Sequence, residues 1–310
     1  MANIAAVSQT GILGASRRRR WQAIEGYLFI LPWLMGFFAF TAGPMVASLV
    51  MTFTRYEILI APEWSGLENY VRLLNDSDIR LSLYNTVYYV LLYVPLHLAT
   101  ALAAAVALNV RYRGVSLYRT MYYLPAVVPS VASIIMWMWI FNPDFGLMNA
   151  FLGLFGVPKI EWLYDTRWAK PAFVVVAVWA LGNAMVIFLA GLQGVPEQLY
   201  EAAAIDGANS WDRFVHVTVP MITPVIFFNL VISIIASFQV FNIAYIATNG
   251  GPQDSTLFLV LYLYRSGFQQ FQMGYASTIA WMLFVIILVF TIIQFRLSER
   301  WVYYEGDERR

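Results

Sequence analysis

A short polar segment, residues 196–208, separates two strongly apolar stretches of this 310-residue chain. It carries two carboxylates, Glu201 and Asp206, around three consecutive alanines. Pro196 and Glu197 are typical of a helix start, and Gly207 is typical of a helix end, so we predict a helix of about ten residues. Small alanines allow another protein to approach the backbone closely, and carboxylates can fix its register through hydrogen bonds or ion pairs. The chemistry predicted here is protein binding.

A second set of polar side chains lies in the apolar stretch at residues 219–247 and could line a solute path. Asn183 lies in an earlier apolar stretch, beside Gly182 and one turn after Trp179, where it could hydrogen-bond to a sugar stacked on the ring. Hydrogen bonds between helices are the alternative for all these polar residues. One stripe, with four-residue spacing, consists of Asn229, Ser233 and Ser237. The second stripe is displaced around the helix and consists of Gln239, Asn242 and Asn249.

Catalytic motifs are absent from the sequence. It has no cysteine, no phosphate-binding loop of the Gly-x-x-x-x-Gly-Lys-Ser/Thr type, and lysine only at positions 159 and 170. No Ser-His-Asp arrangement, carboxylate pair or metal-ligand cluster occurs among the apolar stretches. His97 is the one residue within them of the types Asp, Glu, Lys, Arg and His, and it is either a proton relay or a histidine satisfied by a neighbouring helix. We therefore expect no enzymatic activity, no catalytic residue and no bound metal.

Composition places the chain in a membrane. Hydrophobic residues make up 60% of the chain and charged residues 12%, with a mean hydropathy of +0.64, whereas soluble domains have roughly 25% charged residues. The net charge of +1 gives no basic field for nucleic acid. Arg17–Arg20 and the following apolar run superficially resemble a signal peptide. That run is too long for one, since a signal peptide has an apolar core of roughly 7–15 residues, so we predict a retained first span.

We predict an all-α membrane protein, because six segments have the roughly 20 apolar residues that a spanning helix needs. The connection at residues 142–171 is rich in glycine and proline, with an apolar stretch at 147–155, and indicates an external loop containing a short interfacial helix. The six segments are residues 27–53, 83–110, 120–141, 172–192, 219–247 and 276–295.

The distribution of Lys and Arg predicts the orientation. With the N-terminus inside, 12 of the 19 basic residues are cytoplasmic and 7 external. Both termini and the polar segment 196–208 are then cytoplasmic. The predicted organisation is a cytoplasmic tail at residues 1–24, one six-span domain at 25–297 with its polar loop at 196–220, and a second cytoplasmic tail at 298–310.

The polar loop resembles a known motif. Glu201-Ala-Ala-Ala-Ile-Asp-Gly-Ala208, followed by Phe214 and Pro220, is similar to the EAA loop of permease subunits of ATP-binding-cassette (ABC) importers. Residues 66–70, 122–125 and 248–252 are similar to carbohydrate-uptake permeases of the maltose and glycerol-phosphate type, and the resemblance covers nearly the whole chain. The chain lacks the extra N-terminal spans and large external domain that a maltose-type subunit can carry.

The resemblance implies a permease subunit in the cytoplasmic membrane of a bacterium or archaeon, moving a carbohydrate by alternating access. The loop would form a coupling helix between spans 4 and 5 that docks into an ATPase subunit, which binds ATP and Mg²⁺. The other implied partners are a second permease subunit, an extracytoplasmic solute-binding protein and membrane lipid. The coupling residues would be Leu199, Tyr200, Glu201, Ala202, Ala203, Asp206 and Gly207, and the substrate path would include Asn183, Ser237, Gln239 and Asn242.

Three rival functions remain at the level of sequence. An importer of another solute, such as glycerol phosphate or an amino acid, would share the coupling loop, but an anion would favour a path rich in Lys or Arg. An ion-coupled secondary transporter usually carries carboxylates within its spans, and none is present in the six segments. An intramembrane enzyme would need the catalytic groups that the sequence lacks.

Overall fold

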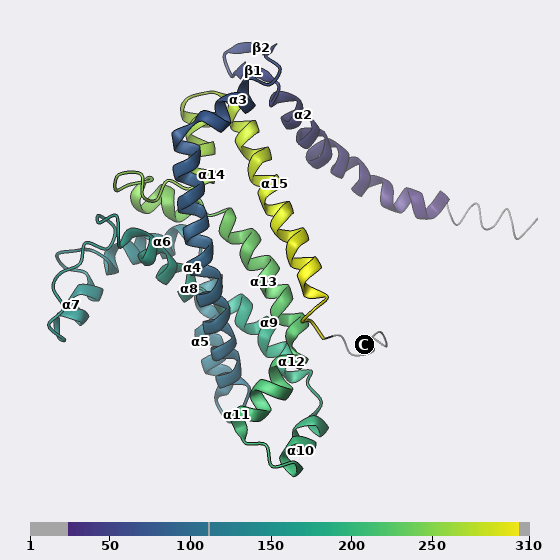
Figure 1. The fold of residues 1–310 in the computed structure, drawn as a ribbon, viewed down its shortest axis with the longest axis vertical. Coiled ribbons are helices and arrows are strands. Elements are labelled where there is room, and N and C mark those ends of the chain that lie inside the picture. Colours follow the sequence, from purple (N-terminus) through teal and green to yellow (C-terminus); the bar gives the residue numbers. More distant parts are fainter. Residues whose placement is uncertain (1–23, 111, 304–310) are drawn as a thin grey trace, which may run out of the picture.

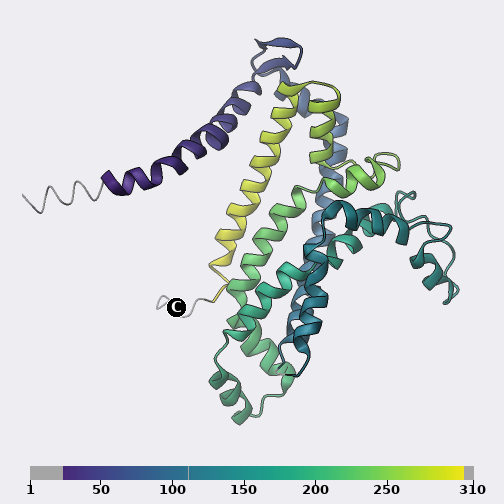
Figure 2. The same cartoon turned by 180° about the vertical axis from the view of Figure 1, so that it is seen from behind.

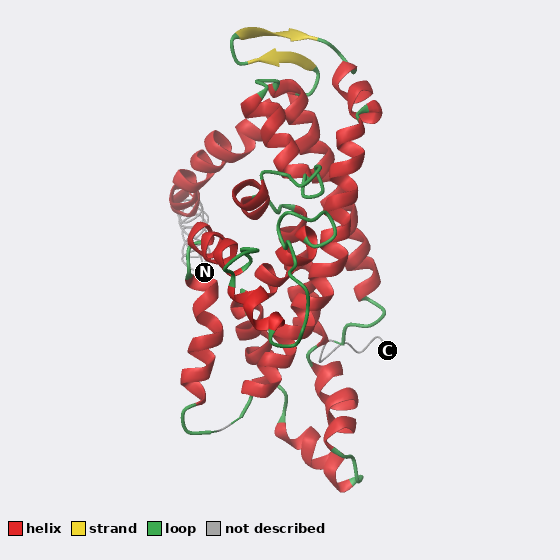
Figure 3. Ribbon diagram, turned by 90° about the vertical axis from the view of Figure 1, so that its left-hand side faces the viewer, coloured by secondary structure: helices red, strands yellow, loops and turns green. Residues whose placement is uncertain are grey.

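The computed structural model describes residues 24–110 and 112–303. The predicted N-terminal tail, except for its last residue, and residues 304–310 of the predicted C-terminal tail lie outside this part of the chain. The described residues form long helices that run side by side, with a small hairpin at one end and two short helices, α10 and α11, at the other (Figures 1 and 3). The arrangement matches the predicted helical class.

Three helices are each long and apolar enough to cross a membrane, by length and composition. The first contains the π-helical turn η1 (Phe38–Ala42) and α2 (Gly43–Met51). It runs away from the helical body, as both face-on views show (Figures 1 and 2), and its most apolar window has no residue buried within the chain. The three helices are Ile24–Met51, α4 (Ser77–Leu108) and α15 (Met273–Ser298).

Three further candidates are pairs of helices with a sharp bend between them, so the described residues contain three candidate spans, or up to six if each pair is one span. The segment that follows α10 contains α11 (Ser210–Arg213), η2 (Phe214–Thr218) and α12 (Val219–Met221) before it bends into α13. The pairs are α5 (Val115–Val127) with α6 (Ser130–Ile140) at 99°, α8 (Ala169–Trp179) with α9 (Gly182–Gln193) at 49°, and Ser210–Met221 with α13 (Thr223–Phe238) at 66°.

The bends revise the prediction of continuous helices. Proline disfavours the helical conformation in the residue before it, and Val128 before Pro129 has ψ of 133°. This ends α5 and starts α6 in a new direction, so the predicted segment 120–141 is two helices. The predicted segment 219–247 is also interrupted, because α13 ends at Phe238 and the π-helical turn η3 (Ala244–Thr248) follows after a short irregular stretch.

Smaller elements lie between the long helices, and the hairpin was not predicted. β1 (Thr54–Glu57) pairs antiparallel with β2 (Ile60–Trp64), and Phe53 stacks on Trp64 with ring centroids 5.8 Å apart. The predicted short helix within 147–155 is present as α7. The remaining short elements are α3 (Glu68–Asn75), α7 (Leu147–Gly153), α10 (Glu197–Ile205), α14 (Leu259–Tyr264) and η4 (Arg265–Gln269).

The core forms around α4, which packs against α8, α9, α13 and α14. Ala101 and Ala105 on α4 are fully buried and belong to one cluster with Met185 and Phe188 of α9. Their small side chains allow the two helices to approach closely. Since α4 contacts both halves of the bent pair α8–α9, it fixes the position of the bend between them.

Polar contacts join the helices at the hairpin end of the molecule. Lys170 on α8 is only 9% exposed, and its ammonium group donates to Asn85 of α4 at 2.9 Å and lies over the rings of Tyr84 and Tyr88. The Asn85 amide donates in turn to the carbonyl oxygens of Asp254 and Leu257. One buried cation thus links α8, α4 and the loop that precedes α14.

Asp76, the residue before α4, makes a second polar cluster at the same end. Its carboxylate accepts hydrogen bonds from the hydroxyl groups of Tyr262 at 2.6 Å and Tyr275 at 2.5 Å, and from the backbone amide of Asp78. Burial raises the pKa of Asp76, but the hydroxyl and amide donors lower it by more, so the net pKa lies below its ordinary value. The carboxylate therefore ties α4 to α14 and α15.

We expect Asp76→Ala to lower the free energy of unfolding by about 1.5–3 kcal/mol, because two buried hydroxyl groups lose a charged acceptor. Because the pKa of Asp76 is lower in the folded chain than in the unfolded chain, its ionised carboxylate stabilises the fold. This stabilisation is complete above the unfolded pKa of about 3.9 and is lost as the pH falls through the lower pKa of the folded state. Thermal unfolding in detergent from pH 7 to pH 3 checks this. The wild-type midpoint should fall more steeply than that of Asp76→Asn below about pH 4; parallel curves would contradict the assignment.

Candidate functional site

The polar segment predicted to bind a protein forms a short helix at one end of the molecule (Figure 1). Helix α10 spans nine residues, Glu197–Ile205, and Pro196 lies just before it. Gly207 has φ of +82°, a conformation that glycine adopts without steric cost. This turn lets the amide of Ala208 donate to the carbonyl of Ala203 at 2.9 Å and closes the helix.

Most of the predicted coupling residues lie on the outside of α10. Glu201, Ala202, Asp206 and Gly207 are exposed, Leu199 is 39% exposed, and Ala203 is half-buried. The exposed set presents carboxylates and a small-residue surface to the outside of the molecule. A protein surface could approach this side of the helix without displacing other parts of the chain.

Tyr200 has a different position from its neighbours. Its side chain is half-buried, and its hydroxyl group lies 3.0 Å from the hydroxyl group of Thr218 at the end of η2. The ring lines a cavity of about 280 Å³ with Leu192 of α9 and Phe214 of η2. Tyr200 therefore connects α10 to the helices behind it.

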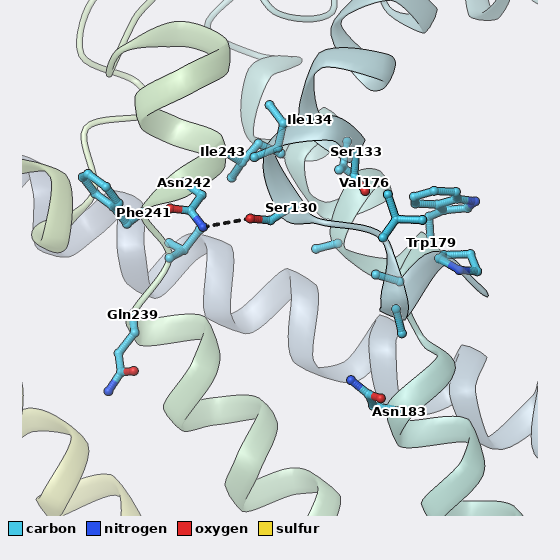
Figure 4. A pocket seen from close by; sticks show the side chains of 16 residues that line it. Ser130, Ser133, Ile134, Val176, Trp179, Asn183, Gln239, Phe241, Asn242 and Ile243 are labelled. Carbon is cyan, nitrogen blue, oxygen red and sulfur yellow. Dashed lines mark hydrogen bonds between the residues drawn. The ribbon is translucent and has the colours of Figure 1, made fainter. Parts of the chain in front are cut away.

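A second polar region lies where three interrupted helices meet (Figure 4). A cavity of about 400 Å³ is lined by residues at the break between α5 and α6, at the break between α8 and α9, and at the end of α13. Interrupted helices leave backbone groups without helical partners, and membrane transporters place such breaks beside their substrate sites. The volume is within the range of small-molecule sites, about 300–1,000 Å³.

Three of the four predicted path residues line this cavity: Asn183, Gln239 and Asn242. The Asn242 amide donates to the hydroxyl group of Ser130 at 3.2 Å, the bond drawn in Figure 4. The amides of Asn183 and Gln239 make no hydrogen bond within the described part of the chain and lie on opposite sides of this bond in the close-up. The cavity therefore offers uncharged donors and acceptors.

Ser237, the fourth predicted residue, is not at the cavity. It is 2% exposed, and its hydroxyl group donates to the carbonyl of Ile234 at 2.9 Å. Asn229 and Ser233, on the same stripe of α13, are likewise buried. The stripe through Ser237 thus packs inside the chain, whereas Gln239 and Asn242 on the other stripe are exposed to the cavity.

Sequence reasoning missed Ser130 and Ser133, which line the cavity from α6, but it did propose Trp179, also in the lining, as a ring on which a sugar could stack. Pro129 was the available signal, because it predicts a break that brings the start of α6 to an interior site. The Trp179 ring packs edge-on against Trp137, with centroids 5.8 Å apart. Trp179 thus adds an aromatic surface to the hydroxyl and amide groups.

The described residues contain no group of three or more His, Cys, Asp and Glu side chains that could hold a metal. His97 is 8% exposed and stacks on Tyr93 with ring centroids 4.9 Å apart. Its Nδ1 atom has no hydrogen-bond partner within residues 24–110 and 112–303, so no neighbouring helix satisfies that nitrogen. His97 does not line the cavity described above.

Gly182 holds α9 against α5 immediately beside the cavity. A Cβ atom at this position would lie 2.8 Å from the Cα atom of Tyr123 and 3.0 Å from the carbonyl oxygen of Tyr122. We expect Gly182→Val to lower the free energy of unfolding by about 1–3 kcal/mol, since the backbone must move. Thermal unfolding in detergent measures this, with Gly153→Val as the matched control because a Cβ there meets nothing within 4 Å. Equal midpoints for both variants would contradict the close contact.

Comparison with known proteins shows similarity along most of the chain. Residues 97–303 match the family described as binding-protein-dependent transport system inner membrane component. A probable ABC transporter permease protein, YesP of Bacillus subtilis, is 45% identical over 298 residues, covering 94% of this chain and 96% of that protein. The lactose transport system permease protein LacF of Rhizobium radiobacter is 37% identical over 290 residues, covering 90% and 96%.

A further relative is the sn-glycerol-3-phosphate transport system permease protein UgpA of Pectobacterium atrosepticum, 35% identical over 287 residues with coverage of 90% and 95%. Among solved structures, a chain of a bacterial ABC transporter involved in the import of the acidic polysaccharide alginate has a TM-score of 0.81 at 23% identity, covering 93% of this chain and 98% of that chain. That likeness concerns the fold. The family match and the relatives together show that this chain belongs to the inner-membrane permease components of binding-protein-dependent transport systems, a family of transport proteins rather than enzymes.

Proposed function

We propose that the chain is the permease subunit of an ATP-driven carbohydrate importer and moves its solute by alternating access. Each bent helix pair then counts as one span, which gives six. The observation that carries the proposal is the connection between the two sites. The exposed helix α10 continues through α11, η2 and α12 into α13, and α13 ends at Phe238, immediately before Gln239 at the cavity.

The physical basis of coupling is this short connection. Tyr200 contacts Thr218 at the end of η2, so a push on α10 acts directly on the segment that leads into α13. Thr223 at the start of α13 is buried and accepts a hydrogen bond from the backbone amide of Tyr303 at 2.9 Å. Movement of this end would therefore also involve the residues that follow α15. We infer that ATPase closure pushes α10, tilts the attached spans and opens the cavity outward.

The energy comes from partner subunits in this proposal. The chain has no phosphate-binding loop, and we propose that two ABC ATPase subunits bind ATP and Mg²⁺ and receive α10 in a cleft. The contact residues are those predicted from sequence, with Tyr200 acting mainly from behind the helix. The polar loop at residues 196–220 then lies in the cytoplasm, as do both termini.

A second permease subunit would cover apolar surfaces that the chain leaves open. The helix at Ile24–Met51 has no buried residue in its most apolar window. A groove of about 720 Å³ beside the cavity is lined mainly by apolar and aromatic side chains of α4, α5 and α8, and it shares Pro125 and Trp179 with the cavity. Lipid would cover what the second subunit does not. An extracytoplasmic solute-binding protein would deliver solute at the hairpin end.

A neutral sugar fits the cavity best. The polar groups that line it are uncharged amides and hydroxyls, and the Trp179 ring offers a stacking surface. No Lys, Arg, Asp or Glu is among its lining residues. Glycerol phosphate and amino acids remain as second candidates, the former because UgpA is among the relatives. A charged solute would lack a counter-charge in this chain, so the second permease subunit would have to supply it.

Co-purification tests the proposed function. The tagged chain should be extracted in mild detergent with its associated proteins, and ATP hydrolysis should be measured with binding protein loaded with candidate sugars. We expect an ABC ATPase and a second permease in the complex, and hydrolysis that rises only with the cognate loaded binding protein. A chain that purifies without any ATPase, or uptake driven by an ion gradient without ATP, would contradict the proposal and favour a secondary transporter.

A further inference from the structure

The cavity that Tyr200 lines lies behind α10, at the end of the molecule that α10 and α11 form (Figure 1). Its volume of about 280 Å³ is below the roughly 300–1,000 Å³ of sites for drug-sized molecules, so it has room only for a small ligand. It shares no lining residue with the cavity of the proposed solute path. The polar residues that line it are Asn109, Tyr200, Ser210, Arg213 and Thr218.

The cavity contains a positive charge that no carboxylate in its lining balances. Arg213 is the only charged side chain among the described residues that line it. Its Nε atom is buried and has no hydrogen-bond partner in the described part of the chain, and its Nη2 atom makes one long contact, 3.4 Å from the Ser210 hydroxyl group. Nε and Nη2 form an edge of the guanidinium that can bind a carboxylate or phosphate with two parallel hydrogen bonds. This edge is therefore suited to an oxyanion.

A second guanidinium group adds positive charge nearby. An adjoining cavity of about 550 Å³ shares three lining residues with the first, Tyr200 among them. Arg119 lines the adjoining cavity, and its Nη2 atom donates to the carbonyl oxygen of Leu108 at 2.8 Å, which offsets the negative end of the α4 dipole. Glu197 also lines the adjoining cavity. The smaller cavity at Arg213 is therefore the better place for an anion.

Hydroxyl groups surround this charge and connect the cavity to α10. The hydroxyl groups of Tyr200 and Thr218 lie 3.0 Å apart. A hydroxyl group can turn its hydrogen toward an anion. A ligand in the cavity would reach α10 through Tyr200, α11 through Arg213, and the end of α4 through Asn109. Since α4 lies at the centre of the core, such a ligand would hold α10 in place.

We propose that this cavity binds a phosphate oxyanion, which the Nε and Nη2 atoms of Arg213 hold and the hydroxyl groups of Tyr200 and Ser210 orient. The bound anion holds α10 against the end of α4 and slows its movement. This regulation rests on the proposed function, in which the movement of α10 drives transport and the ATPase subunits release phosphate at this end of the molecule. Free inorganic phosphate and the headgroup of a phospholipid share the required chemistry.

Equilibrium binding to the purified full chain tests the site. Inorganic phosphate and, separately, a short-chain phosphatidylglycerol are titrated in a neutral detergent, with chloride at equal ionic strength as the reference. We expect one phosphate group bound per chain. Arg213→Gln should raise the Kd at least about 10-fold, because hydrogen bonds to charged groups are the strong ones. Arg296→Gln is the matched control, since Arg296 is exposed on α15 and does not line the cavity.

Tyr200→Phe is a second variant that keeps the packing of the ring and removes only its hydroxyl group. We expect it to raise the Kd about 2- to 12-fold, the range for one neutral hydrogen bond. Thermal unfolding without phosphate shows whether each variant folds. If Arg213→Gln does not fold, Tyr200→Phe still decides the test, and an unchanged Kd in a folded Tyr200→Phe chain would contradict the site.

Hydrogen exchange of the same chain tests the effect on α10. A ligand that binds only the closed arrangement, present at ten times its Kd, lowers the open population about 11-fold. The backbone amides of residues 198–206 should then exchange more slowly by this factor, whereas those of the hairpin at residues 54–64 should not change. The slowing should disappear in Arg213→Gln. Binding without slower exchange in α10 would overturn the proposed hold on this helix.

The remaining outcomes separate the two phosphate sources and the two proposals. Binding of only one ligand that depends on Arg213 identifies the source as free phosphate or as lipid. If neither ligand binds better than chloride, or if Arg213→Gln and Arg296→Gln weaken binding equally, the cavity is not an oxyanion site. These measurements need no ATPase. A chain that binds phosphate at Arg213 but purifies without an ATPase would contradict the proposed function and leave the site intact.

Discussion

Replacing both Glu201 and Asp206 by lysine is expected to abolish ATP-driven solute uptake while the chain still inserts into the membrane. Both side chains are exposed on or just after α10, so the change leaves the helical core intact. Two reversed charges at a protein interface place like charges against the partner, which typically costs several kcal/mol. Uptake of labelled sugar into cells or proteoliposomes measures the effect, and the amount of chain in the membrane fraction confirms insertion.

The matched control for this variant removes the charges without reversing them. Glu201→Gln with Asp206→Asn keeps side-chain size and most hydrogen-bonding capacity, so we expect reduced but measurable uptake. Normal uptake in the double lysine variant would show that the carboxylates of α10 take no part in coupling. Loss of the lysine variant from the membrane would instead indicate a folding defect, and thermal unfolding of the purified chain distinguishes the two.

Removing the three cavity amides is expected to lower uptake at least about 10-fold. A site built to hydrogen-bond its substrate loses much of its affinity when polar groups of the complex are left without partners. The variant is Asn183→Leu, Gln239→Met and Asn242→Leu, in which leucine has the branched shape of asparagine and methionine is close in length to glutamine. All three side chains are exposed to the cavity, so we expect a normal fold and normal ATPase binding. Uptake should be measured over a range of sugar concentrations together with ATP hydrolysis.

Ser237→Ala is the control for the cavity variant. Its hydroxyl group is buried against the carbonyl of Ile234 and does not line the cavity. We expect uptake within about 2-fold of wild type, because only one local hydrogen bond is lost. An unchanged triple variant, or a Ser237→Ala variant as defective as the triple variant, would place the solute path elsewhere.

The helix of the polar segment could be predicted because its signals are local. Pro196, Glu197 and Gly207 mark its limits in the sequence, and the structure differs only in placing Pro196 just before the first helical residue. The apolar stretches likewise gave the positions of the long helices, because hydropathy depends on composition alone. Polar spacing predicted two polar faces. The structure buries one of them, Asn229, Ser233 and Ser237, on α13 and exposes Gln239 and Asn242 of the other beyond the end of α13.

Features that depend on distant contacts could not be predicted. Asn85 contacts the carbonyl of Leu257, 172 residues away, and no local pattern indicates this pairing. Ser237 was assigned to the path because spacing cannot tell which polar stripe faces the interior of the chain. The break between α8 and α9 has no proline inside it, and Gly182 explains the close contact with α5 but not the bend. The hairpin follows from pairing of two short strands that lie outside the predicted apolar stretches.

The central claim is that α10 controls access to the cavity. It can be tested most directly by cysteine labelling, because the chain has no native cysteine. A single Gln239→Cys substitution places a thiol at the cavity, and its reaction with a membrane-impermeant maleimide added from outside is followed in the assembled complex. We predict that ATP and loaded binding protein raise the labelling rate about 5- to 150-fold, the usual range of allosteric coupling. The increase should disappear when Glu201→Lys and Asp206→Lys are added. A rate that is the same with and without ATP, or an increase that persists in the lysine variant, would contradict the account.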